Sequence, residues 1–168
     1  MARTELWSMD HQRAVPKWLI ALAVVALVVR IISDNWKLEH EGGPSLVKWV
    51  ALSDSAARAA ATKRPIMYDF SAEWCGPCKQ MDRAVFDNPK FAARINNNLV
   101  PVHVIDRKQE DGRNPPAIAA LQQIYHVNAF PTLIVADANG HALTRMEGFR
   151  GPQEFETQMK RWIGGPIR

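Results

Sequence analysis

Two patterns of apolar and polar residues alternate along residues 45–168. Short apolar runs bounded by Pro, Gly, Asn or Asp predict strands, and longer stretches with an apolar stripe predict helices. The expected strands cover residues 45–52, at a sheet edge, 65–70, 99–105, 132–136 and 142–147. The expected helices cover residues 53–62, 79–86, 90–96, 117–125 and 152–162. This order predicts an α/β fold, with a mixed central sheet that carries helices on both faces.

Two polar segments separate these elements. Residues 106–116 are charged and rich in helix and strand breakers, so we expect a surface loop there. Residues 137–140 read Asp-Ala-Asn-Gly, which is typical of a hairpin turn between two strands.

The first 44 residues follow another pattern. Residues 1–17 are polar, residues 18–32 are apolar except for Arg30, and residues 33–44 end in Gly-Gly-Pro. We expect a polar head, a transmembrane signal anchor and a linker, followed by one domain over residues 45–168.

The apolar run of residues 18–32 has more than one interpretation. Fifteen helical residues extend about 22 Å, which is short for a hydrocarbon core of about 30 Å. The length suits a signal peptide, but no small-x-small cleavage pattern follows it. Lys17 and Arg30 can reach the two interfaces, and Trp18 suits an interfacial belt. We therefore expect an uncleaved single-pass anchor with the domain on the extracytoplasmic side; a cleaved signal peptide is the alternative, and the flanking charges barely decide the orientation.

Charge excludes one class of partner. The formal net charge is +4, and the excess of basic residues lies entirely beyond residue 44. These charges are interspersed, without a basic run or interleaved aromatic residues, so no nucleic-acid partner is expected.

The two cysteines of the chain, Cys75 and Cys78, lie together in Trp-Cys-Gly-Pro-Cys. They fall between the strand of residues 65–70 and the helix of residues 79–86, and Pro77 suits a first helical turn. The free N–H groups of a helix N-terminus favour a thiolate on Cys75, and Cys78 is close enough to resolve a mixed disulfide. A zinc site would need two more ligands, for which the sequence offers only scattered histidines. We expect a redox-active disulfide, with no metal and no other cofactor.

Residues 69–79, Asp-Phe-Ser-Ala-Glu-Trp-Cys-Gly-Pro-Cys-Lys, resemble the active-site stretch of thioredoxin. The chain resembles the C-terminal thioredoxin-like domain of the thiol:disulfide interchange protein DsbD more closely. Counterparts occur in order at residues 64–67, 85–89, 130–132 and 147–149. The resemblance covers residues 45–163 and implies a thioredoxin-like fold.

Asp69 lies in the middle of an apolar strand, where burial of a carboxylate is unfavourable without a purpose. We expect a buried acid with a raised pKa that exchanges protons with Cys78, as the resemblance also implies. The alternative is a solvent-facing aspartate on an edge strand.

The resemblance also implies a peptide-binding surface. It places a cis bond between Phe130 and Pro131 beside the disulfide, where an extended peptide pairs with the backbone. Gly148 is expected to leave room for that peptide, and Trp74 to lie exposed beside the cysteines. Gly76 and Pro77 resemble the pair found in reducing members.

The sequence departs from thioredoxin in two ways. Thioredoxin places a lysine four residues before the aspartate that ends its second central strand, and counting back from Asp106 gives Val102 here. The segment from residue 106 to residue 131 is also longer than in thioredoxin, as in the DsbD-like branch.

These observations predict a membrane-tethered oxidoreductase that reduces disulfides of protein substrates. Its electron donor would be a membrane protein or a thioredoxin-type dithiol. Direction depends on reduction potential, so an oxidase or isomerase is an alternative. A binding or assembly module with secondary redox activity is another.

Overall fold

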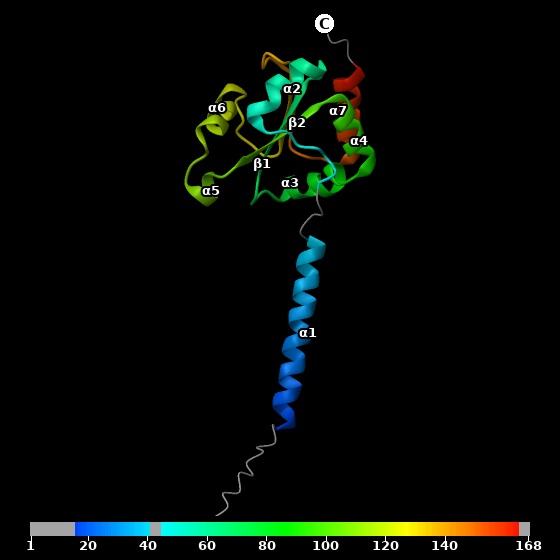
Figure 1. Ribbon diagram of the computed structural model, residues 1–168, viewed down its shortest axis with the longest axis vertical. Helices are drawn as coiled ribbons and strands as arrows, with labels where there is room; N and C mark the ends of the chain where they lie inside the picture. The colour runs from blue at the N-terminus through cyan, green and yellow to red at the C-terminus, as the bar shows by residue number, and fades with distance from the viewer. Residues whose placement is uncertain (1–15, 41–44, 165–168) are drawn as a thin grey trace, which may run out of the picture. The chain divides into compact units, whose positions relative to one another are not determined.

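The computed structural model describes residues 16–40 and 45–164 (Figure 1), so most of the expected polar head and the last linker residues lie outside it. The chain divides into two units, Met1–Glu41 and Gly42–Arg168. The first unit contains helix α1 (Lys17–His40), which continues through the beginning of the expected linker because no Pro or Gly interrupts residues 33–40. Among the described residues, no helix is both long and apolar enough to cross a membrane.

The second unit contains the expected helices and, except for the strand expected at residues 45–52, the expected strands. In chain order its elements are η1 (Leu52–Asp54), α2 (Ser55–Thr62), β1 (Ile66–Ala72), α3 (Gly76–Met81), the π-helical η2 (Asp82–Phe86), α4 (Pro89–Asn98), β2 (Val100–Asp106), α5 (Lys108–Asp111), α6 (Pro116–Ile124), β3 (Thr132–Ala136), β4 (Ala142–Glu147) and α7 (Pro152–Gly164).

The described strands form one mixed sheet in the order β2-β1-β3-β4. β1 pairs parallel with β2 and antiparallel with β3, and β3 pairs antiparallel with β4. Every residue of β1 is buried, as expected for a strand with neighbours on both edges and helices on both faces. The prediction of a mixed α/β sheet is confirmed.

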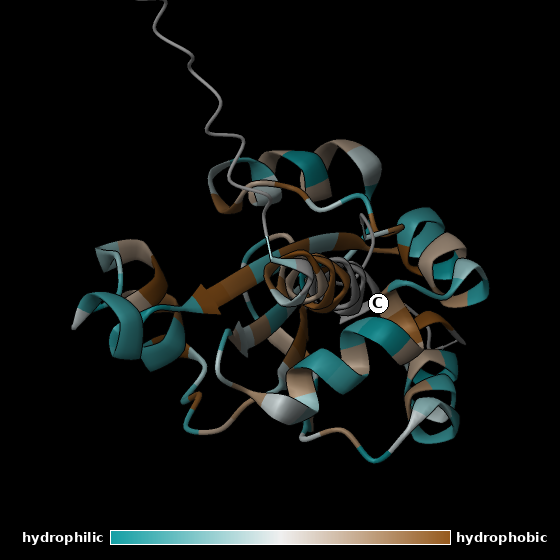
Figure 2. Ribbon diagram, turned by 90° about the horizontal axis from the view of Figure 1, so that it is seen from below, coloured by the Kyte–Doolittle hydropathy of each residue, from teal (hydrophilic) through white to brown (hydrophobic). Residues whose placement is uncertain are grey.

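Alternate residues of the strands face two separate cores. On one face, Met67 and Leu133 pack with residues of η2, α4 and α7. On the other, Tyr68 and Ile134 pack with residues of α2 and α6. Figure 1 shows these two groups of helices on opposite sides of the sheet, and Figure 2 shows hydrophobic strands inside hydrophilic helix surfaces.

The prediction of an edge strand at residues 45–52 is wrong. Residues 45–51 form no strand, although Val47 is buried in the core and the Val50 N–H donates to the Pro101 carbonyl oxygen at 2.8 Å. N–H and C=O of one strand residue point to the same side, so a ladder here would need an N–H from Pro101, which has none. The segment therefore packs beside β2 without joining the sheet.

Candidate active site

The turn from β1 into α3 positions the two cysteines. The Cys75 N–H donates to the Ala72 carbonyl oxygen at 3.1 Å, which folds the chain back at the end of β1. Cys75 is the N-cap of α3, and its Sγ accepts a hydrogen bond from the Cys78 N–H at 3.2 Å. Pro77 lies in the first turn, where its missing N–H leaves no helical bond unmade. The expected strand-to-helix placement is confirmed.

Cys75 and Cys78 form a disulfide with an S–S distance of 2.06 Å. Their residues are 3% and 1% exposed, and they pack with Ala72 and the half-buried Phe130. In the reduced protein, the Cys78 N–H and the start of α3 are placed to stabilise a thiolate on Cys75. Among the described residues, no group of three or more His, Cys, Asp and Glu side chains lies where it could hold a metal ion.

Asp69 is fully buried in the central strand β1, so the solvent-facing alternative is wrong. Burial raises the pKa of Asp69 well above its usual value, and the nearby Asp82 carboxyl raises it further. Neither carboxyl oxygen has a hydrogen-bond partner. The protonated form therefore persists to higher pH than in an ordinary aspartate, as expected from a carboxyl inside an apolar run.

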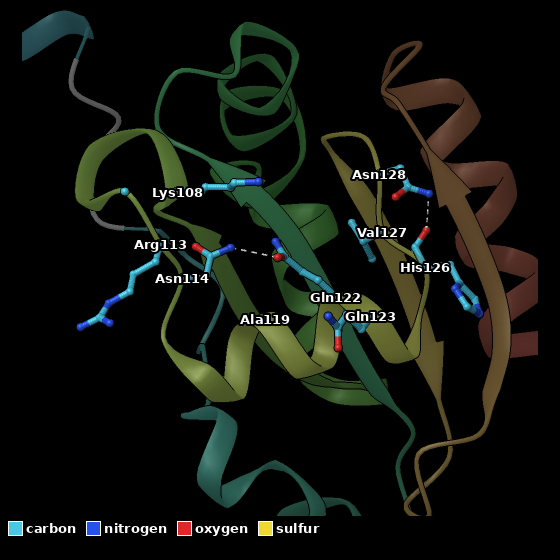
Figure 3. Close-up of a pocket in the computed structure, with 10 residues that line it drawn as sticks. Lys108, Arg113, Asn114, Ala119, Gln122, Gln123, His126, Val127 and Asn128 are labelled. Carbon is cyan, nitrogen blue, oxygen red and sulfur yellow. Dashed lines mark hydrogen bonds between the residues drawn. The ribbon is translucent and has the colours of Figure 1, made fainter.

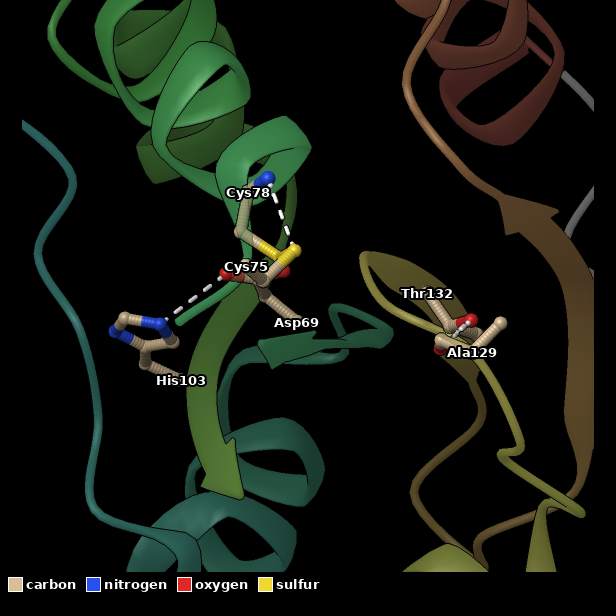
Figure 4. The surroundings of a disulfide bond; sticks show 6 residues. All are labelled: Asp69, Cys75, Cys78, His103, Ala129 and Thr132. Atoms are coloured by element: carbon tan, nitrogen blue, oxygen red, sulfur yellow. Dashed lines mark hydrogen bonds and ion pairs between the residues drawn. A yellow bond between two sulfur atoms is a disulfide. The ribbon is translucent and has the colours of Figure 1, made fainter. Parts of the chain in front are cut away.

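His103 is the residue opposite Asp69 in the register of β1 and β2. Its Nε2 lies 3.4 Å from Asp69 Oδ2, within ion-pair reach but without the geometry of a hydrogen bond. Burial lowers the pKa of His103, which favours its neutral form. Figure 4 joins the two side chains by a dashed line and draws the disulfide in the same view.

Counting four residues back from Asp106, as for the lysine of thioredoxin, gives Val102 and does not identify His103 as the neighbour of Asp69. Val102 is fully buried in the opposite core, with Tyr68 and Phe70. Alternation along β2 puts His103 on the face of Asp69, so the parity of the two strands is the signal that could have identified it.

A second acid near the site, Asp82 in η2, was also missed by the sequence reasoning. Burial raises its pKa to about 6, and the Asp87 carboxyl contributes to that shift. Asp82 lies four residues after Cys78, a spacing that brings side chains to one helix face and could have pointed to it.

The expected peptide-binding residues gather on the other side of the disulfide. Trp74 is 50% exposed, and its ring packs edge-on against Phe130 with the ring centroids 5.9 Å apart. The bond between Phe130 and Pro131 is cis, as predicted. Figure 4 shows the neighbouring Ala129 and Thr132 across from the cysteines.

Gly148 lies beside this bond, since its N–H donates to the Pro131 carbonyl oxygen at 2.8 Å. A Cβ at residue 148 would meet no atom of the chain within 4 Å, so the room expected there for a peptide stays a prediction. The φ of +72° gives a separate reason for a glycine, since L side chains disfavour that conformation. A Cβ at Gly76 would also meet no atom within 4 Å.

A hollow of about 640 Å³ lies over α6 and the segments that flank it (Figure 3). Polar side chains line much of it, among them Lys108, Asn114 and Gln122. Neither cysteine and none of the site residues expected from the sequence belongs to this lining, so the hollow is separate from the candidate active site.

Comparison with known sequences agrees with this geometry. Thiol:disulfide interchange protein DsbD of Ralstonia nicotianae is 33% identical over 120 residues, which cover 70% of this chain and 19% of that protein. DsbD of Yersinia pestis is 25% identical over 146 residues, with 82% and 23% covered. The chain thus spans less than a quarter of the length of these two relatives.

Solved structures share the fold. A DsbH oxidoreductase aligns with a TM-score of 0.61 at 21% identity, over 76% of this chain and 89% of that one. The oxidised C-terminal domain of DsbD from Neisseria meningitidis aligns with a TM-score of 0.52 at 21% identity, over 64% and 88%. The sequence model of the thioredoxin-like domain matches residues 52–162, and the chain therefore belongs to the thioredoxin-like family.

Proposed function

We propose that the protein is a thiol:disulfide oxidoreductase that reduces disulfides in protein substrates through Cys75 and Cys78. The observation that carries the proposal is the disulfide at the start of α3, with the Cys78 N–H directed at Cys75 Sγ and with Asp69 buried in β1, the strand that leads to the two cysteines. The names of the DsbD relatives, thiol:disulfide interchange proteins, describe the same chemistry.

The reaction moves two electrons from the dithiol to the substrate. The Cys75 thiolate attacks one substrate sulfur, a mixed disulfide forms, and the other substrate sulfur leaves as a thiolate that takes up a proton. Cys78 then gives its proton to the Asp69 carboxylate while its Sγ attacks Cys75 Sγ. The second substrate thiolate leaves, and the Cys75–Cys78 disulfide of the present structure results. A membrane protein or a thioredoxin-type dithiol must then reduce that disulfide.

Substrate binding is assigned to the surface beside the disulfide. The exposed Trp74 ring and Phe130 offer apolar contact, and the backbone at Pro131 can pair with an extended peptide. The hydrogen bond from Gly148 holds the neighbouring strand end against Pro131.

The proposal places this chemistry at a membrane. The described apolar side chains of α1 are exposed, Trp18 by 62%, Leu22 by 57% and Val25 by 58%, which supports burial of this segment by another phase or partner. We propose that residues 18–32 anchor the chain and that the domain lies on the extracytoplasmic side.

The direct test is trapping with Cys78→Ser in the full chain. This variant should accumulate mixed disulfides on Cys75 that dissolve under reductant, because the resolving thiol is gone. Cys75→Ser is the matched control and should trap nothing. Both variants should lose the ability to catalyse the reduction of insulin by dithiothreitol. Client binding that survives with both cysteines replaced, and no insulin reduction by the wild type, would indicate a binding module instead.

A further inference from the structure

Asp69 needs a route for its proton. Its side chain is fully buried, so a proton taken from Cys78 cannot pass directly to water. His103 lies against the carboxyl, with Nε2 at 3.4 Å from Oδ2, and its own side chain is 28% exposed. The histidine therefore spans the distance between the buried acid and solvent.

The residues around the Asp69–His103 pair come from η2, from α3 and from the segment that precedes η1. Asp82 from η2 acts on the Asp69 carboxyl electrostatically, and α3 brings Cys78. On the other side, the Trp49 indole packs against the His103 imidazole, with centroids 5.0 Å apart and planes inclined by 30°. Trp49 holds the imidazole ring in place and carries no charge. Among the ion pairs of the described residues, His103 takes part in one, which joins its Nε2 to Asp69.

The polar atoms of the pair are unsatisfied in the resting arrangement. Asp69 Oδ1, Asp69 Oδ2 and His103 Nε2 have no hydrogen-bond partner. A fold normally satisfies buried polar groups, and unsatisfied ones persist where another role needs them. An acid and a base left facing one another can exchange a proton after a small rotation of the imidazole.

We propose that His103 is a positioning residue that relays the proton between Asp69 and solvent while Cys78 resolves the mixed disulfide, an inference that rests on the proposed dithiol function. The Asp69 carboxyl, having received the Cys78 proton, gives a proton to His103 Nε2. The imidazolium then releases the proton on Nδ1 to water and returns to a neutral ring. One proton leaves the dithiol and one reaches solvent, so the relay conserves protons and moves no electrons.

The relay has a measurable signature. When the pair holds a single proton, burial favours that proton on Asp69, and the minor state with the proton on His103 leaves Asp69 as the carboxylate that is able to accept from Cys78. Without the imidazole, the carboxylate forms only by loss of the proton to bulk water. An adjacent cation changes a carboxyl titration by about 1–3 units. His103→Gln should therefore shift the acid limb of the resolution rate upward by about one unit and reduce the rate at pH 7 about tenfold.

The experiment uses the full chain in detergent. The wild type, His103→Gln and the control His141→Gln are reduced and mixed with a model disulfide between pH 5 and pH 9. Fluorescence of Trp74, which adjoins the dithiol, reports the resolution step. His141 is an exposed histidine beside Asp137 in the β3–β4 turn, so its loss should leave the profile unchanged. His103→Lys, which restores a cation, should move the acid limb back to lower pH.

A superimposable profile for His103→Gln and the wild type would overturn the relay. A pH titration of Asp69 and His103 by NMR separates this outcome from failure of the proposed function. It is carried out on the reduced wild type and needs no turnover. Coupled two-step curves for the two residues support the relay, also where His103→Gln fails to fold. Independent single-step curves would contradict it. Absence of disulfide reduction by the wild type, with coupled curves, would overturn the proposed function alone.

Discussion

Asp69 shows how one residue links stability and chemistry. The carboxyl lies in the central strand with no hydrogen bond to either oxygen, so ionising it in the folded chain is unfavourable. The same feature makes it able to hold the proton of Cys78. We expect this conflict to appear as a dependence of folding stability on pH.

The first prediction concerns Asp69→Asn. Because burial raises the folded pKa above the unfolded one, the folded chain binds more protons, and stability is lost as pH rises toward the folded pKa. The wild type should lose up to about 1.4 kcal/mol per pH unit relative to Asp69→Asn, starting near pH 4. Urea unfolding at several pH values measures this, with Glu110→Gln as an exposed carboxyl control. A constant difference between the wild type and Asp69→Asn would contradict the raised pKa.

The sequence could predict Asp69 and the two cysteines because each depends on its immediate neighbours. An acid inside an apolar strand and a Cys-Gly-Pro-Cys turn carry their meaning locally. His103 depends on which residue of β2 faces Asp69, and the register of two strands is set by the packing of the whole sheet. For the same reason, counting along the chain selected Val102, which faces the other core.

At the scale of elements, the segment after β2 was predicted as an open loop and contains the short helix α5 instead. One part-buried network of hydrogen bonds holds it. Asn114 accepts from the Arg107 N–H at 2.6 Å and donates to Asp106 Oδ2 at 2.5 Å, and Gln122 of α6 donates to the same oxygen at 2.9 Å. The side chain of Asn114 thus closes the segment between β2 and α6.

We predict that Asn114→Ala destabilises the fold by about 1–3 kcal/mol at pH 7, because it leaves buried polar groups unpaired. Burial raises the pKa of Asp106, but the hydrogen bonds from Asn114 and Gln122 lower it overall. That contribution to stability is present above the unfolded pKa and is lost as pH falls, so the deficit of the variant should narrow in acid. Denaturant unfolding at pH 7 and pH 3 tests this, with the exposed neighbour Arg113→Ala as control. An equal deficit at both pH values would show that Asp106 is not involved.

Each strand that formed as predicted pairs with a neighbour in the sheet. The predicted strand that failed lacks a hydrogen-bond donor opposite it. Residues 45–52 have the composition of an edge strand, but Pro101 removes the N–H that the ladder needs. The helix expected at residues 79–86 instead begins at Gly76 and continues as the π-helical η2 from Asp82 to Phe86. Tertiary packing decides such changes of helix type, and the periodicity of apolar residues does not record them.

At the scale of the whole molecule, the chain separates a helix with exposed apolar side chains from a unit that contains both hydrophobic cores. Among the residues whose side chains the structure describes, neither core includes one from α1. The disulfide, Asp69 and His103 also belong entirely to the second unit. Folding and dithiol chemistry are therefore expected to be independent of the first 44 residues, and the contribution of these residues is placement.

Removal of residues 1–44 should leave a folded, active domain. Its unfolding midpoint and its rate of insulin reduction should match those of the full chain within about twofold, because the cores and the active site are complete without α1. Reduction of a membrane-bound partner should fall, since tethering raises the local concentration of the dithiol at the bilayer. Carbonate extraction provides the control, in which the full chain stays with the membrane and the truncated chain does not. If the chain expressed with residues 1–44 is released from the membrane with a shortened N-terminus, residues 18–32 are a cleaved signal peptide. The anchor would then have to be abandoned, while the independence of the domain would stand.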